Sequence, residues 1–80
     1  MKAKIYVTLK KGVLDPQGRA ILSSLSHLGI AGVEDVRVGK YMEIGMKDVG
    51  PEEARRRLDD ACRRLLANTV IEDYRIEIGE

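Results

Sequence analysis

Apolar and polar residues alternate strictly over residues 2–10. The apolar set is Ala3, Ile5, Val7 and Leu9, and the opposite set is Lys2, Lys4, Tyr6, Thr8 and Lys10. Successive side chains of a strand point to opposite faces of a sheet. The pattern therefore predicts a first strand with one buried face and one wet face.

Beyond Gly12 the apolar residues recur at helical spacing instead, at positions 14, 21, 22, 25 and 28. Asp15 and Pro16 stand at the start of this stretch. An aspartate there accepts hydrogen bonds from the free amides of a first turn, and proline suits the first helical position. Gly29 is a natural stop, because glycine readily takes the left-handed conformation that ends many helices. The spacing predicts a helix over residues 16–28.

The middle of the chain reads VGKYMEIGM over residues 38–46. The apolar residues of this stretch and of the segment before it all have even numbers, so they lie on one face of an extended chain: Val36, Val38, Met42, Ile44 and Met46. A two-residue hairpin turning at Gly39-Lys40 would put Glu43 on the apolar face and turn Met42 outward, so register disfavours it. A long strand bent at Gly39 preserves the parity, and so does a hairpin with a three-residue loop. We favour the long bent strand.

Gly50-Pro51-Glu52-Glu53 opens a second helix, with acidic residues near its positive end. A narrow apolar stripe follows: Ala54, Leu58, Ala61, Cys62, Leu65 and Leu66. Asn68 is placed to end this helix in the left-handed conformation. Alternation returns over residues 71–78 and predicts a last strand. The order β-α-β-α-β predicts an α+β fold: a mostly antiparallel three-stranded sheet with both helices packed on one face, as a single domain over residues 1–80.

Size and charge narrow the functional classes. A domain of 80 residues buries only ~60–65% of the surface that its unfolded chain exposes, so we expect a partner or a second copy to add burial. The net charge of +1 and the three tyrosines, with no Phe or Trp, are not typical of a nucleic-acid binder. The lysine-rich N-terminus does not resemble a signal peptide, and no apolar run approaches the ~18–20 residues that span a bilayer. We expect a soluble, cytoplasmic protein.

Few residues are candidates for chemistry. Gly39-Lys40 is not a Walker loop, which needs GxxxxGK[ST] between a strand and a helix. Tyr41 replaces the Ser or Thr here and a strand follows, which favours a structural bend over an anionic contact. Cys62 lies on the apolar stripe and is interpreted as a buried, inert thiol. His27, the only histidine, has no obvious catalytic partner. One cysteine and one histidine provide neither an intrachain disulfide nor a zinc site.

Charged residues of the second helix form the other candidate group. Arg55, Arg56 and Arg57 are followed one turn later by Asp59 and Asp60. This pattern favours a solvated, ion-paired surface, with an acidic patch on a partner as the alternative. We therefore expect no catalytic residues, no metal site and no cofactor site in this chain.

Three blocks of sequence, taken together, resemble a known family. They are YVTLKKGVLDPQGRA over residues 6–20, VRVGKYMEI over residues 36–44 and LANTVIEDYRIEI over residues 66–78. They are similar to V-x-L-K-x-G-V-x-D-P-x-G, V-R-x-G-K-x-[IM]-E and L-[LA]-[AN]-N-x-V-I-E-[DN]-Y of the PurS family, the small subunit of phosphoribosylformylglycinamidine synthase. The resemblance covers essentially the whole chain. Lys11 and Thr69 stand where proline is common in that family, and both changes affect turns.

The resemblance implies a part in de novo purine biosynthesis. In that family a PurQ-type glutaminase subunit releases ammonia, and a PurL-type synthetase subunit uses ATP, Mg and that ammonia to convert an amide into an amidine. The resemblance implies that this chain is a non-catalytic bridge between the two, associates with itself as a dimer or tetramer, and binds no cofactor, nucleic acid or membrane. ATP, Mg and glutamine are then used by the partner subunits.

The matching blocks also supply candidate interface residues in three groups. They are Lys10, Gln17 and Gly18; Arg37, Gly39, Lys40, Tyr41 and Glu43; and Asn68, Glu72, Asp73 and Tyr74. Asp15 and Pro16 match as well, but helix capping explains them equally. A different class of function remains as the alternative: a regulatory module that binds a small molecule and acts as a homo-oligomer.

Overall fold

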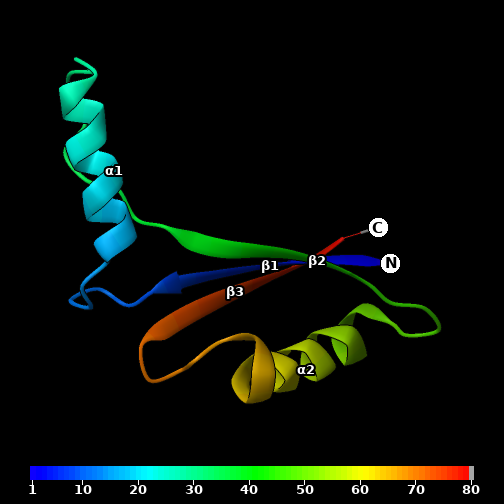
Figure 1. The fold of residues 1–80 in the computed structure, drawn as a ribbon. Helices are drawn as coiled ribbons and strands as arrows, with labels where there is room; N and C mark the ends of the chain where they lie inside the picture. Colours follow the sequence, from blue (N-terminus) through cyan, green and yellow to red (C-terminus); the bar gives the residue numbers. More distant parts are fainter. Residues whose placement is uncertain (80) are drawn as a thin grey trace.

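The computed structural model describes residues 1–79, which form a small antiparallel sheet and two α-helices (Figure 1). The elements are β1 (Lys2–Leu9), α1 (Pro16–His27), β2 (Gly39–Gly45), α2 (Pro51–Ala61), a π-helical turn η1 (Cys62–Leu66) and β3 (Glu72–Gly79). The strand order is β2-β1-β3, and both neighbours run antiparallel to β1. The predicted α+β fold is confirmed.

The core lies between the sheet and α2. Ala3, Ile5 and Val7 of β1 are fully buried, whereas Lys2 and Lys4 on the other face are exposed, as the alternation predicts. From the helical side the buried residues are Ala54, Leu58, Cys62 and Ala67. Because β1 is central, its apolar face receives side chains from both neighbouring strands and from α2.

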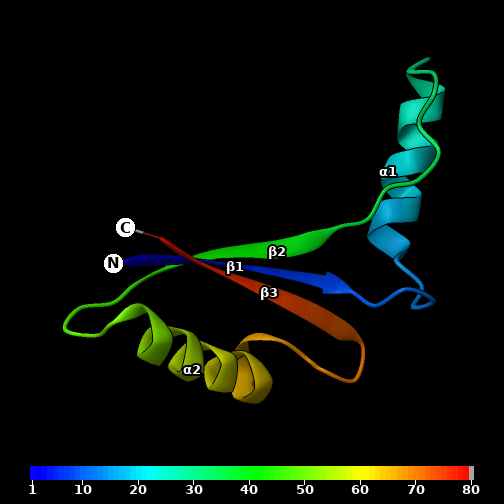
Figure 2. The ribbon, with the colours of Figure 1, turned by 180° about the vertical axis from the view of Figure 1, so that it is seen from behind.

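Helix α1 does not pack on the sheet, which corrects the predicted arrangement of both helices on one face. Figures 1 and 2 show α1 standing off beyond β2, while α2 lies along β3. The radius of gyration is 16.0 Å, against about 12 Å for a compact domain of this length. The apolar spacing identified an amphipathic helix, but such spacing does not specify which surface covers the helix.

The middle strand is shorter than predicted, and the alternative hairpin does not occur within the described residues. β2 begins at Gly39, and residues 33–38 form an extended segment that runs back along α1. The predicted parity is confirmed, because Met42 and Ile44 pack against the core and Glu43 is exposed. A Cβ at Gly39 would lie 2.4 Å from the Val7 carbonyl oxygen, so this glycine permits close approach of two strands.

The helix ends follow the sequence with one exception. α2 starts after Gly50 with Glu52 and Glu53 in its first turn, and Gly29 has φ +78° just beyond α1. Among residues 1–79, however, the non-glycine residue with a positive φ is Asp48. Asn68 does not adopt the left-handed conformation, so the cap predicted there is wrong. The π-helical turn ends α2 instead, closed by the Ala67 amide on the Cys62 carbonyl at 2.9 Å. No helix in the described part is long and apolar enough to span a bilayer.

Candidate interaction surfaces

The base of α1 is held by a buried carboxylate, which defines what we call the α1 junction (Asp15, Gly18, Arg37 and Val38). Asp15 is only 5% exposed. It accepts hydrogen bonds from the Gly18 amide at 2.9 Å and from the Val38 amide at 2.8 Å. These two bonds, led by that from Val38, hold the pKa of Asp15 below its usual value. The carboxylate thus joins the first turn of α1 to the segment that leads into β2.

Two further contacts fix the direction of α1 at this junction. A Cβ at Gly18 would lie 2.1 Å from the Val36 carbonyl oxygen, so the backbones meet there without room for a side chain. The Arg37 guanidinium donates to the carbonyls of Val13 at 3.2 Å and Lys10 at 3.0 Å. Arg37, a predicted interface residue, therefore ties the chain after β1 to the chain before β2.

The structure brings several predicted interface residues into one hollow beside the α1 junction. Its lining includes Gln17, Gly39, Lys40 and Glu72, together with Val7 and Leu9 of β1. Lys40 Nζ lies 3.8 Å from a Glu72 carboxylate oxygen. This ion pair joins the two edge strands across β1. Lys10 lies next to the hollow, where its carbonyl accepts from Arg37.

Tyr41 and Glu43 lie instead on the open face of the sheet, opposite the face on which α2 packs. The Tyr41 hydroxyl donates to Glu43 at 2.8 Å, and this bond, with some burial, raises the pKa of Tyr41 to about 12. The rings of Tyr41 and Tyr6 have centroids 5.2 Å apart, and the Arg75 guanidinium carbon lies 4.2 Å from the Tyr6 centroid. Such a stack combines aromatic and cation–π attraction.

Sequence reasoning missed Tyr6 and Arg75. The available signal was their parity, because both lie on the polar side of strongly alternating strands, and the register places them directly opposite one another. That register was not deducible without knowing which strands pair.

The C-terminal group of predicted residues is not a single surface. The Asn68 amide donates to Glu72 at 2.7 Å, and the Asn68 side chain accepts from Val70 at 3.2 Å, so Asn68 shapes the turn before β3. Tyr74 faces α2, and its hydroxyl donates a hydrogen bond to Asp59. This hydrogen bond, together with burial, raises the pKa of Tyr74. Asp73 lies on the open face with Tyr41.

The ion-paired surface predicted for α2 is confirmed, but the charged residues pair differently from the predicted pattern. Glu53 accepts from both Arg56 and Arg57, whereas the two aspartates pair with arginines one turn later: Asp59 with Arg63 and Asp60 with Arg64. The hydrogen bonds from Arg56 and Arg57 lower the pKa of Glu53. Arg55 differs, because it donates to the Ile76 carbonyl of β3 at 3.1 Å. Cys62 is fully buried, and burial raises the pKa of its thiol.

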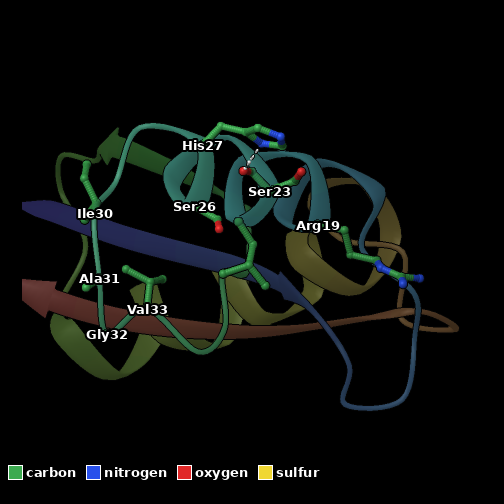
Figure 3. A pocket seen from close by; sticks show the side chains of 9 residues that line it. Arg19, Ser23, Ser26, His27, Ile30, Ala31, Gly32 and Val33 are labelled. Atoms are coloured by element: carbon green, nitrogen blue, oxygen red, sulfur yellow. Dashed lines mark hydrogen bonds between the residues drawn. The ribbon is translucent and has the colours of Figure 1, made fainter.

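The free side of α1 carries exposed apolar side chains and a shallow hollow (Figure 3). Ile21 of α1 is 43% exposed, and Leu14 and Leu28, which flank the helix, are 61% and 74% exposed. The hollow lies between α1 and the chain that follows it, and its lining is Arg19, Leu22, Ser23, Ser26, His27 and residues 30–33. His27 Nδ1 lies 2.8 Å from the Ser23 carbonyl, a contact drawn in Figure 3. Residues 1–79 contain no group of three or more His, Cys, Asp or Glu side chains that could hold a metal.

A projecting helix with exposed apolar residues, fixed rigidly to a small sheet, is typical of an assembly module, which works through the surfaces it presents. The chain belongs to the PurS family, because the family model described as "Phosphoribosylformylglycinamidine (FGAM) synthase" matches residues 2–80. The family resemblance of the three sequence blocks is thereby confirmed.

Individual relatives are similar over nearly the full length of the chain. The PurS subunit of Bacillus subtilis is 49% identical, covering 99% of this chain and 93% of the relative. The PurS subunit of Synechocystis is 51% identical, covering 94% and 75%. Among solved structures, Methanocaldococcus jannaschii PurS superimposes with a TM-score of 0.90 at 39% identity, covering 99% and 95%. A chain from the structure of PurLQS of Thermotoga maritima gives 0.87 at 30% identity, covering 95% and 93%.

Proposed function

We propose that this chain is the non-catalytic assembly subunit of FGAM synthase in de novo purine biosynthesis. It bridges a PurQ-type glutaminase subunit and a PurL-type synthetase subunit, and it associates with itself. Two observations support the proposal: the family match over residues 2–80, and the likeness to a chain of the Thermotoga maritima PurLQS assembly.

The observation that carries the proposal is the shape of the chain. Asp15 and Arg37 hold the base of α1, yet Ile21 on the helix and Leu28 at its end remain exposed. A rigid helix that its own sheet does not cover is suited to contact other chains. The regulatory-module alternative gains no comparable observation.

The chemistry of the reaction explains why such a subunit is useful. Ammonia released by a glutaminase is protonated in bulk water, so a sealed contact between the two active sites preserves the neutral nucleophile. Sealing requires complementary surfaces rather than reactive groups. In this proposal ATP, Mg and glutamine bind to the partner subunits, this chain binds no cofactor, and the complex works in the cytoplasm.

The test is reconstitution of amidine formation from the three purified subunits. We expect the glutamine-driven rate to collapse when this chain is omitted, while the rate with added ammonium salt survives better. Equal loss with both nitrogen sources would point to stabilisation of the synthetase and contradict a coupling role. Sedimentation of the mixture shows directly whether this chain enters the complex.

A further inference from the structure

The hydrogen bonds between β1 and β3 show which backbone groups of β3 point away from the sheet. The Lys10 amide donates to the Ile71 carbonyl at 2.9 Å, one position beyond the paired residues Leu9 and Glu72. In an antiparallel pair, residues that bond across the pair alternate with residues whose N–H and C=O groups point the other way. Counting from Ile71, the outward residues of β3 are Glu72, Tyr74, Ile76 and Ile78.

The sequence of β3 gives this edge little protection of its own. It reads EDYRIEIG and contains neither proline nor lysine, two residues that commonly protect the edges of sheets. It also suits a second copy of itself. In an antiparallel pair centred on Ile76, Arg75 of each strand lies opposite Glu77 of the other, and opposite charges at facing positions stabilise strand pairs. Left bare, β3 would be a template for unwanted strand addition.

Arg55 differs from the other arginines of α2 and η1 in what it contacts. Those four pair with carboxylates of α2: Arg56, Arg57, Arg63 and Arg64. Arg55 instead donates through Nη1 to the Ile76 carbonyl oxygen of β3, at 3.1 Å. Carboxylates stand within reach along the helix, at Glu52 and Asp59, three and four residues away. The guanidinium is thus directed to the sheet although ion-pair partners are available on the helix.

The carbonyl that Arg55 holds lies near the middle of the outward edge of β3. An added strand needs this acceptor, and a neutral amide would replace a charged donor, whose hydrogen bonds are stronger. Helix α2 lies along β3 (Figure 1), and Arg55, Asp59, Tyr74 and Ile76 contribute to the lining of a hollow between them. A strand entering there would have to displace the guanidinium and cover charged groups, which costs desolvation energy.

Two further contacts keep this edge closed. The Tyr74 hydroxyl donates to Asp59 and so holds α2 beside the strand. The Glu72 amide, the first outward donor of β3, is already bonded to the Asn68 carbonyl at 2.7 Å. Each contact occupies the edge or the space beside it, and Arg55 blocks the central acceptor.

We propose that Arg55 guards the β3 edge: its guanidinium holds the Ile76 carbonyl and prevents β3 of another copy from pairing there. Copies that added at β3 as well as at other contacts would form an open row of subunits, whereas a blocked edge keeps the assembly closed. The guard is separate from the proposed function, because it concerns a contact that the chain avoids rather than its contacts with the larger subunits.

The first test compares Arg55→Ala with Arg57→Ala by sedimentation over a range of concentrations. Both variants lose one exposed positive charge from α2, but Arg57 contacts Glu53 of its own helix and not β3. Both should stay folded, with melting temperatures near that of the unmodified chain.

The sedimentation coefficient should reach a plateau for the unmodified chain and for Arg57→Ala, and should keep rising for Arg55→Ala. We expect the constant for this additional association to increase roughly tenfold or more. Identical behaviour of Arg55→Ala and the unmodified chain would overturn the inference. An equal rise in Arg57→Ala would also overturn it, since loss of charge alone would then explain the effect.

Hydrogen exchange shows whether the additional association uses β3. The amides of Tyr74, Ile76 and Ile78 point outward, so they should exchange quickly in the unmodified chain. In concentrated Arg55→Ala they should become protected, while in Arg57→Ala at the same concentration they should not. Additional association without this protection would place the contact on another surface and overturn the inference. Protection of these amides in the unmodified chain at high concentration would overturn it too, because the edge would then be used rather than guarded.

Discussion

The two helices begin alike but are used differently. Each starts with proline, and each carries an apolar stripe. In α2 that stripe is buried on the sheet, with Leu58 only 4% exposed, whereas Ile21 of α1 is 43% exposed and Leu28, which caps α1, is 74% exposed. Helix α2 thus has its partner surface within the chain, whereas the apolar residues at α1 have no such cover within residues 1–79, and their use as a contact for another chain stays a prediction.

The largest effect that tests this comparison comes from matched leucine truncations. Leu58→Ala leaves a cavity in the core and should lower the free energy of unfolding by ~2–5 kcal/mol. Leu28→Ala should change it by less than about 0.5 kcal/mol, since the side chain is exposed in the single chain. Denaturant unfolding at concentrations where the chain is monomeric measures both. A large loss for Leu28→Ala in the monomer would show that α1 is packed on its own sheet in solution.

A glycine at the α1 junction provides the next test. In an isolated helix Gly→Ala stabilises by about 1 kcal/mol. Gly18→Ala should instead destabilise by ~1–3 kcal/mol, because the new methyl group collides with the Val36 carbonyl. Gly45→Ala is the control, since a Cβ there meets nothing within 4 Å. Hydrogen exchange along α1 and residues 33–38 locates the change. Stabilisation by Gly18→Ala would indicate that the junction is loose.

The junction could be predicted only in part from the sequence. The capping role of Asp15 followed from the Asp-Pro pair, and its hydrogen bond to Gly18 bears it out. The second bond, to Val38, joins residues 23 positions apart. A single sequence does not show which distant amide meets a capping carboxylate. The direction of α1 depends on that bond, and so it was not predicted.

More of the sheet than of the α1 junction could be predicted from the sequence, and the reason is physical. Alternation of apolar and polar residues specifies both a strand and its buried face. In the structure Ile5 is buried and Met42 packs against the core, as that alternation predicts. Of the candidate interface residues, Arg37 and Gly39 have structural duties that the motif alone did not reveal. Their use as interface residues stays a prediction, as does that of Gln17 and Asp73.

The loss of folding stability in acid provides a smaller effect that distinguishes the carboxylates at the starts of the two helices. The pKa of Asp15 is lowered in the folded chain, so its contribution is complete above the unfolded pKa of about 3.9 and disappears as the pH falls through the folded pKa. The same sign holds for Glu53 at α2, where arginines lower the pKa. We expect Asp15→Asn and Glu53→Gln each to flatten the loss of stability below about pH 4. Salt should weaken the Glu53 contribution more than that of Asp15, because backbone amides dominate at Asp15 and the charge of Arg37 adds only a smaller share. Equal salt sensitivity in thermal unfolding of the two variants would contradict this assignment.

The smallest effect concerns the ion pair that joins the two edge strands. Lys40 and Glu72 lie 3.8 Å apart, and the lysine side chain is 59% exposed. Such pairs contribute about 0–1 kcal/mol, so Lys40→Ala should barely change the melting temperature. Self-association should also persist, because the lysine is paired within the chain, with Glu72. If Lys40 instead binds a larger subunit, the variant will lose affinity in a sedimentation titration with that subunit. A marked fall in melting temperature would show that its aliphatic stem packs over Val7 and Leu9 in the hollow.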